Sequence, residues 1–286
     1  MRKYWKTVLT SIFLIACITL LNASATTIRI LAIGNSFSRD AVEQYLYELG
    51  ADEEIDFIIG NMYIGGCSLE RHRNNANNNA AEYAYRKIVN GVKTSRANTT
   101  LEYAIGDEPW DYISFQQASP NSGLYATYFP YLTELLTYVK SKVTNTNVKY
   151  MLHQTWAYAQ NSTHDGFNNY SRDQLTMYAA IIDAMHRVKE NVPDISFIIP
   201  SGTAIQNGRT SAVGDNFCRD GYHLDYQIGR YTAACTWFEK ITGINVVGNK
   251  AIPNGLSDFQ VEVAQNAAHF AVLKPEEVTP MDVYIR

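Results

Sequence analysis

The segment Ile28–Ser38 reads IRILAIGNSFS, and it decides the fold prediction. Its first six residues are almost all apolar, as in a short strand buried in a sheet, and a glycine ends the run. The next segment, Asp40–Leu49, carries apolar side chains at helical spacing. A buried strand followed at once by a helix is the opening unit of an α/β protein.

The rest of the chain repeats this alternation. Four more apolar segments are predicted as strands: Ile55–Ile59, Asp111–Phe115, Val148–His153 and Ile195–Pro200. Helical patterns cover about Asp173–Asn191, Leu224–Thr242 and Ser257–Val272. The alternation predicts an α/β protein with a central parallel five-stranded sheet covered by helices on both faces. A ligand site is expected at the edge where the strand carboxyl ends meet.

The length and composition fit one globular domain, predicted over residues 26–286. Hydrophobic residues make up 46% of the 286 positions and charged residues 18%, which excludes a disordered chain. The net charge of −4 argues against a nucleic-acid partner. Residues 72–100 form a predicted hairpin-like insertion near the rim of the site, with its turn at Asn90-Gly91.

Residues 1–25 have the features of a signal peptide. The basic start MRKYWK precedes the mostly apolar run Val8–Leu21, and Ala-Ser-Ala ends at Ala25. Export to the periplasm or the extracellular space is therefore predicted, with no stable membrane span. Lipidation of Cys17 is the alternative, which we disfavour because the residues after Cys17 stay apolar.

Ser36 is the candidate nucleophile. It follows a strand and a glycine at the point where a helix begins, so its hydroxyl can face the cleft. Its backbone N–H would lie at the positive end of that helix. The alternative is that Ser36 or Ser38 only caps the helix, because serine is a favoured N-cap residue.

A carboxylate and an imidazole follow late in the chain, in the sequence RDGYH before the last helices. Asp220 and His223 are three residues apart, so a turn lets the carboxylate accept a hydrogen bond from Nδ1 of the imidazole. Nε2 is then left to face a serine hydroxyl. Asp225 is a second carboxylate that could take this role, and a surface turn with an incidental histidine is the other interpretation.

The two segments Gly34–Ser38 and Asp220–His223 resemble the first and last blocks of the SGNH (GDSL-like) hydrolases. The closer resemblance is to a little-characterised branch whose first block reads Gly-Asn-Ser-Phe, and it extends over about Ile28 to Gly243. The resemblance implies a flavodoxin-like three-layer α/β/α sandwich and an esterase mechanism. In that mechanism Ser36 attacks, His223 acts as general base and acid, and Asp220 orients the imidazole.

The resemblance also implies an oxyanion hole. The backbone N–H of Ser36 would be one donor, and the family's second block supplies a glycine N–H, for which we prefer Gly66 to Gly65. A simple turn at Gly65-Gly66 is the alternative.

The third block departs from the family pattern, because Gly-x-Asn-Asp is absent. The third strand is followed by Gln116 and Gln117, and a glutamine amide can donate to an oxyanion as asparagine does. We expect Gln116 to be the donor, with Gln117 and Asn121 as alternatives.

The fourth block is the sequence HQTWAY after the fourth strand. We expect His153, Trp156 and Tyr158, together with Gln117, to contact the substrate, with the aromatic side chains as a wall for a sugar ring. Packed aromatic residues at a strand end are the alternative. A metal site built from His153, His164 and His223 is disfavoured because no two histidines have the close spacing of metal ligands, so neither metal nor cofactor is predicted.

Three cysteines remain if Cys17 leaves with the signal peptide. Cys235 lies in an apolar helical pattern and is expected to be buried. Cys67 and Cys218 each lie beside a segment with candidate catalytic residues. They could form a disulfide in an exported protein, or they could be two unrelated thiols.

Taken with the resemblance, these features predict a secreted serine esterase acting on a small-molecule or glycan ester. A carbohydrate esterase that removes acetyl or similar acyl groups is the leading hypothesis, which rests on fold analogy, export and the aromatic residues. The alternatives are a non-catalytic glycan-binding protein and an enzyme that transfers the acyl group to an acceptor other than water.

Overall fold

The computed structural model describes residues 26–284, so the predicted signal peptide and Cys17 lie outside the described residues. Seven strands form one sheet in the order β4-β3-β2-β1-β5-β6-β7. Their bounds are Thr26–Gly34 (β1), Ile55–Tyr63 (β2), Tyr83–Val89 (β3), Val92–Thr99 (β4), Tyr112–Phe115 (β5), Lys149–His153 (β6) and Ile195–Ile199 (β7). Strands β2, β1, β5, β6 and β7 run parallel, as the apolar segments predict.

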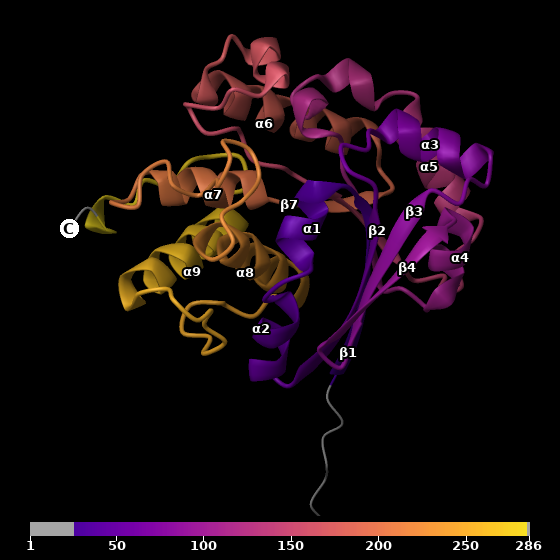
Figure 1. The fold of residues 1–286 in the computed structure, drawn as a ribbon, viewed down its shortest axis with the longest axis horizontal. Helices are drawn as coiled ribbons and strands as arrows, with labels where there is room; N and C mark the ends of the chain where they lie inside the picture. The colour runs from indigo at the N-terminus through magenta and orange to yellow at the C-terminus, as the bar shows by residue number, and fades with distance from the viewer. Residues whose placement is uncertain (1–25, 285–286) are drawn as a thin grey trace, which may run out of the picture.

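Helices cover both faces of this sheet, so the predicted three-layer α/β/α fold is confirmed. Figure 1 shows α1, α2, α7, α8 and α9 on one side of the strands and α3, α4 and α5 on the other. The helices are α1 (Ser36–Val42), α2 (Leu46–Asp52), α3 (Leu69–Asn77), α4 (Leu101–Asp107), α5 (Tyr131–Lys140), α6 (Gln174–Asn191), α7 (Ser201–Arg209), α8 (Ile228–Thr242) and α9 (Asp258–Leu273). Short 3₁₀ turns include η1 (Ser119–Asn121) and η3 (Asp165–Tyr170).

The sheet has two more strands than the five predicted, because the hairpin in residues 72–100 joins it. Strand β3 pairs antiparallel with β2, with Ile88 opposite Ile59, and β4 extends the edge. Asn90 and Gly91 both have positive φ, as a two-residue turn between twisted strands requires. In the described chain this hairpin contributes no residue to the lining of the pocket beside Ser36, so it is an edge of the sheet and not an insertion at the rim.

The helix predicted over Asp40–Leu49 is two short helices. The first begins earlier than predicted, directly after β1, because the Asn35 side chain accepts a hydrogen bond from Phe37 N (2.9 Å) and caps it. The break comes at Tyr45, which has a φ of 72°. Its ring packs edge-on against Tyr231 of α8, with 5.8 Å between ring centroids.

The core lies on both sides of β1, whose residues Ile30–Ile33 have no exposed surface. The tail after Gly248 packs back as expected, since Ser257 caps α9 and that helix lies against α7 and α8. Within residues 26–284 no helix is both long enough and apolar enough to cross a membrane. The carboxyl ends of β1, β2 and β5 meet at one edge, and the loops that follow them build the site.

Candidate active site

Ser36 lies at the junction of β1 and α1, as the first residue of the helix. The turn is tight. A Cβ atom on Gly34 would lie 2.5 Å from Ser38 Oγ, so a side chain there would prevent α1 from starting so close to the strand. Asn35 is the N-cap residue and Ser38 is buried, with its hydroxyl bonded to the Asn35 carbonyl (2.8 Å). Ser36 therefore does not cap the helix, and its hydroxyl remains available to the pocket.

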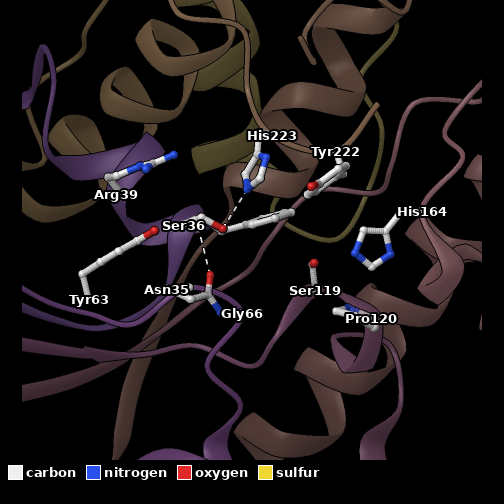
Figure 2. Close-up of a pocket in the computed structure, with 12 residues that line it drawn as sticks. Asn35, Ser36, Arg39, Tyr63, Gly66, Ser119, Pro120, His164, Tyr222 and His223 are labelled. Carbon is white, nitrogen blue, oxygen red and sulfur yellow. Dashed lines mark hydrogen bonds between the residues drawn. The ribbon is translucent and has the colours of Figure 1, made fainter. Parts of the chain in front are cut away.

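Ser36, His223 and Asp220 form a chain of hydrogen bonds (Figure 2 shows its first link). Ser36 Oγ lies 2.9 Å from His223 Nε2, and His223 Nδ1 lies 2.7 Å from Asp220 Oδ2. Because the carboxylate accepts from Nδ1–H, Nε2 is left to accept the serine proton. Asp225 instead accepts from Gln227 N (2.9 Å) and Ile228 N (3.0 Å), so it holds the turn that leads into α8.

The turn that holds Asp220 also keeps it ionised. Burial raises the pKa of this carboxyl group, but hydrogen bonds from the His223 side chain and from the backbone N–H groups of His223 and Tyr222 outweigh burial and lower the pKa below its ordinary value. The two backbone bonds measure 2.7 Å and 3.2 Å. A negative charge is thus fixed behind the imidazole at neutral pH, where it would stabilise an imidazolium ion.

A pocket of about 370 Å³ opens in front of Ser36. Its walls come from the start of α1, the end of β2 and the loop after it, η1, the loop before η3, and the turn that carries His223 (Figure 2). The pocket is lined by Asn35, Ser36, Phe37, Arg39, Tyr63, Gly65, Gly66, Ser119, Pro120, His164, Tyr222 and His223.

Two backbone N–H groups are available beside the serine hydroxyl. Within the described residues, neither Ser36 N nor Gly66 N donates to an acceptor, and both residues line the pocket. Gly66 has a φ of 63°, a conformation that favours glycine, although a Cβ atom there would meet nothing within 4 Å. Asn35 Nδ2 donates to the Cys67 carbonyl (3.0 Å) and ties this loop to the start of α1.

The structure does not place Gln116 in the pocket, which corrects the expected third oxyanion donor. Gln116 is 1% exposed, and its amide nitrogen donates to Asn35 Oδ1 (2.6 Å). Gln117 is also buried and bonds to Leu69 N and to the Thr127 carbonyl. Asn121 ends η1 and does not line the pocket. Gln116 therefore braces Asn35, and neither glutamine lines the pocket.

His153 is likewise buried, and its expected contact with substrate is corrected. Nδ1 donates to Gln116 Oε1 (2.8 Å), because a carbonyl oxygen can only accept, and Nε2 then accepts from Ser201 Oγ (3.1 Å). Burial lowers the pKa of His153 to about 3, so the ring is neutral at ordinary pH.

Trp156 and Tyr158 lie behind the pocket and support its surface. Trp156 has no exposed surface, stacks on Phe37 with 4.4 Å between ring centroids, and donates from Nε1 to the Tyr222 carbonyl (2.8 Å). The Tyr158 hydroxyl lies 2.8 Å from Ser119 Oγ. The aromatic wall predicted from the fourth block therefore exists as packing, while Tyr63 and Tyr222 present aromatic surface to the pocket.

The cysteines and histidines do not form a metal site or a bridge in the described chain. Cys67, Cys218 and Cys235 are free thiols, so the possible Cys67–Cys218 disulfide is not present. Cys235 is buried, as expected. Burial raises the pKa of Cys67 to about 12, which makes it a poor nucleophile at neutral pH. No group of three His, Cys, Asp or Glu side chains among residues 26–284 is arranged to hold a metal ion.

Residues 29–271 match the protein family described as a domain of unknown function (DUF4886). The chain belongs to the DUF4886 family. It is 56% identical to a DUF4886 family protein from Bacteroides uniformis whose crystal structure superimposes with a TM-score of 0.87, over 89% of this chain and 98% of that one.

A protein from Slackia heliotrinireducens, described as "a putative SGNH hydrolase", superimposes with a TM-score of 0.51 at 17% identity, over 75% of this chain and 98% of that one. At that identity the likeness concerns the fold alone, and it confirms the SGNH-like fold expected from the sequence. No curated protein matches the chain.

Sequence reasoning did not assign several lining residues of this DUF4886 protein to the site, among them Arg39, Tyr63, Ser119, His164 and Tyr222. Three had a usable signal, because Arg39 is one helical turn after Ser36, Tyr63 ends the second strand, and Tyr222 lies inside the RDGYH segment. His164 had none. It reaches the pocket through the irregular loop between β6 and η3, and no periodicity predicts the path of such a loop.

Proposed function

We propose that this DUF4886 protein is a serine esterase with Ser36 as nucleophile. The observation that carries the proposal is the chain Ser36–His223–Asp220, whose serine end opens onto the pocket while its carboxylate end is held by a turn. A solvent-accessible serine that donates to an imidazole backed by an ionised carboxylate has the arrangement needed for nucleophilic acyl transfer.

In the proposed reaction His223 Nε2 takes the proton of Ser36 as Oγ attacks the ester carbonyl. The backbone N–H groups of Ser36 and Gly66 stabilise the tetrahedral oxyanion, and each such donor contributes on the order of a hundredfold or more to the rate. The imidazolium then protonates the leaving alcohol. Water, activated by the same imidazole, hydrolyses the acyl-serine and regenerates the enzyme.

We further propose that the substrate is an acylated carbohydrate carrying acetyl or similar groups, and that the protein acts after export. The modest size of the pocket suits a short acyl chain, and Tyr63 and Tyr222 offer aromatic faces to a sugar ring. The signal-like sequence of residues 1–25 supports export. Hydrolysis is favoured over acyl transfer because the Asp220 side chain is 40% exposed, so the triad lies open to water.

The test is hydrolysis of 4-nitrophenyl acetate by the purified protein and by its Ser36→Ala variant. We expect the substitution to lower kcat/KM by roughly ten-thousandfold or more, because the nucleophile and its proton are removed together. Ser95→Ala on the exposed strand β4 is the matched control and should keep full activity. Hydrolysis that survives Ser36→Ala would reject the mechanism, and equal inactivity of both proteins on acetylated glycosides would favour a glycan-binding protein.

A further inference from the structure

Arg39 brings to the pocket a positive charge that has no hydrogen-bonded partner among the described residues. It lies one turn after Ser36 on α1 and lines the pocket on the same side of the serine as Tyr63. Across residues 26–284 its guanidinium group takes part in no hydrogen bond, and its Nε is buried without a partner. Its nearest carboxylate oxygen is Asp40 Oδ1, which lies 3.6 Å from Nη2.

Asp40 neutralises Arg39 only in part, because its single negative charge is shared with Arg219 and Arg230, which bind it more closely. Oδ2 accepts from Arg219 Nη1 (2.9 Å) and from Leu224 N (3.1 Å), and Oδ1 accepts from Arg230 Nη2 (2.6 Å). Asp40 is completely buried, so it has no further surface to offer. Three guanidinium groups thus share one carboxylate, and the one that faces the pocket is left without a hydrogen-bonded anion.

Tyr63 lies beside Arg39 and adds a hydroxyl donor of its own. The Arg39 guanidinium carbon lies 5.5 Å from the centre of the Tyr63 ring, within the range of a cation–π contact. Arg86 lies 5.3 Å from the same ring, but it is paired with Glu43 at 2.9 Å. Figure 2 shows the hydroxyl of Tyr63 and the guanidinium group of Arg39 pointing toward the same side of Ser36.

The opposite side of the pocket has no such charge. It is formed by Ser119, Pro120, His164 and Tyr222. Burial is the main cause that lowers the pKa of His164, and His164 Nδ1 accepts from Gly166 N (2.9 Å), so the neutral ring carries its proton on Nε2. This side can donate hydrogen bonds to hydroxyl groups of a substrate, but it cannot neutralise an anion.

We propose that Arg39 and Tyr63 bind a carboxylate of the substrate, so that the enzyme prefers esters with an acidic group close to the scissile bond. The proposal rests on the esterase function proposed above and names its substrate class. A planar guanidinium fork matches a carboxylate. Among the lining residues Arg39 is the single lysine or arginine, so the pocket offers one positive charge, which suits a carboxylate better than a phosphate dianion.

Two pairs of substrates test the preference and locate the carboxylate. Mono-4-nitrophenyl succinate and 4-nitrophenyl butyrate differ by an acid on the acyl group, while O-acetylglucuronic acid and O-acetylglucose differ by an acid on the alcohol. We expect one pair to show a preference on the order of tenfold to a hundredfold in kcat/KM for the acid, because charge-assisted hydrogen bonds contribute that much. The preference should fall close to one in Arg39→Gln and to an intermediate value in Tyr63→Phe.

Arg96→Gln is the matched control, because Arg96 is exposed on β4 and does not line the pocket. It should keep the wild-type preference. Arg39→Lys should retain part of the preference, since the charge remains but the fork is lost. The proposal is overturned if neither pair shows a preference, or if the preference persists in Arg39→Gln.

A binding measurement separates this proposal from the esterase function. Calorimetric titration of the Ser36→Ala protein with sodium succinate, sodium glucuronate, glucose and inorganic phosphate requires no turnover. If the Ser36→Ala protein binds a carboxylate and the double variant Ser36→Ala/Arg39→Gln does not, the carboxylate site is supported. This holds even if no ester is hydrolysed and the esterase function fails. Ser36-dependent hydrolysis with no Arg39-dependent binding or preference overturns the site and leaves the esterase function standing. Tighter binding of phosphate than of either carboxylate would also overturn the assignment.

Discussion

Two serine–histidine pairs lie in this fold, one at the pocket and one in the core. Ser36 Oγ lies 2.9 Å from His223 Nε2, and Ser201 Oγ lies 3.1 Å from His153 Nε2. His153 is the last residue of β6, and His223 lies in the turn before α8. In each pair a further residue is hydrogen-bonded to Nδ1 of the imidazole, Gln116 for His153 and Asp220 for His223. By hydrogen-bond geometry alone the two arrangements are nearly the same.

Their third partners and their access to solvent differ. Asp220 is a carboxylate that is partly exposed, whereas Gln116 is a neutral amide that is 1% exposed. A neutral partner cannot stabilise an imidazolium ion, and burial lowers the pKa of His153 to about 3. Ser201 has no exposed surface, so no ester can reach it. The comparison teaches that charge and access, more than serine–histidine distance, separate a nucleophile from a structural hydroxyl.

The largest effect expected from this difference is selective labelling by a fluorophosphonate. The reagent should modify Ser36 stoichiometrically and leave Ser201 unmodified, because only Ser36 is activated by an accessible imidazole. Peptide mapping by mass spectrometry locates the adduct. Ser201→Ala should still be labelled and should keep esterase activity within about threefold, while Ser36→Ala should not react. Adducts on both serines, or on Ser201 alone, would break the distinction.

A smaller effect is expected at the two Nδ1 partners. Asp220→Asn should lower kcat by roughly a hundredfold to ten-thousandfold with little change in stability, because the amide no longer fixes the reactive tautomer. Gln116→Leu should instead lower the stability of the protein and change kcat little. It leaves the buried Nδ1 of His153 without an acceptor, which costs about 1–3 kcal/mol of unfolding free energy, and it should lower kcat by no more than about tenfold.

Urea unfolding and 4-nitrophenyl acetate kinetics on both variants test this contrast. If Gln116→Leu lost as much activity as Asp220→Asn at unchanged stability, Gln116 would act at the reacting atoms and not through Asn35. That result would restore the oxyanion role that the sequence suggested for it.

The same contrast shows how far sequence reasoning reaches. Asp220 and His223 are three residues apart, so local turn geometry decides their contact and the spacing predicts it. The five parallel strands were located because each is a short apolar run with clear ends. The pairing of β3 with β2 is not predicted, because the sequence of a hairpin does not indicate which strand of a sheet it pairs with.

The side chains at strand ends were harder to predict. Gln116 follows β5, His153 is the last residue of β6, and Trp156 lies in the loop after it. At such strand ends the regular alternation stops, and each side chain can face either the pocket or the core. Which way each one points depends on packing partners far along the chain, such as Ser201 for His153 and Phe37 for Trp156. No residue pattern near these positions carries that information.

The last expected effect is a pH dependence of stability that comes from the buried histidines. Burial lowers the pKa of His153 and of His72 to about 3, against an ordinary value of 6.5. Between pH 6.5 and pH 3 these histidines are protonated in the unfolded chain and neutral in the folded protein. The free energy of unfolding is therefore highest above pH 6.5 and falls as the pH is lowered. Each histidine should account for about 2 kcal/mol between pH 7 and pH 5. The lowered pKa of Asp220 acts only below its ordinary value of 3.8 and does not enter this window.

Urea midpoints measured at pH 7, 6 and 5 should therefore fall steadily. His153→Phe should lower stability at pH 7 and remove about half of the slope that the two buried histidines cause. Ser36→Ala should keep the full slope, because it alters the pocket pair and leaves the core pair intact. If the slope were unchanged in His153→Phe, the core histidine would have to accept a proton in the folded state near neutral pH. Solvent access would then no longer distinguish the two pairs, and the charged partner Asp220 would be left as the difference between them.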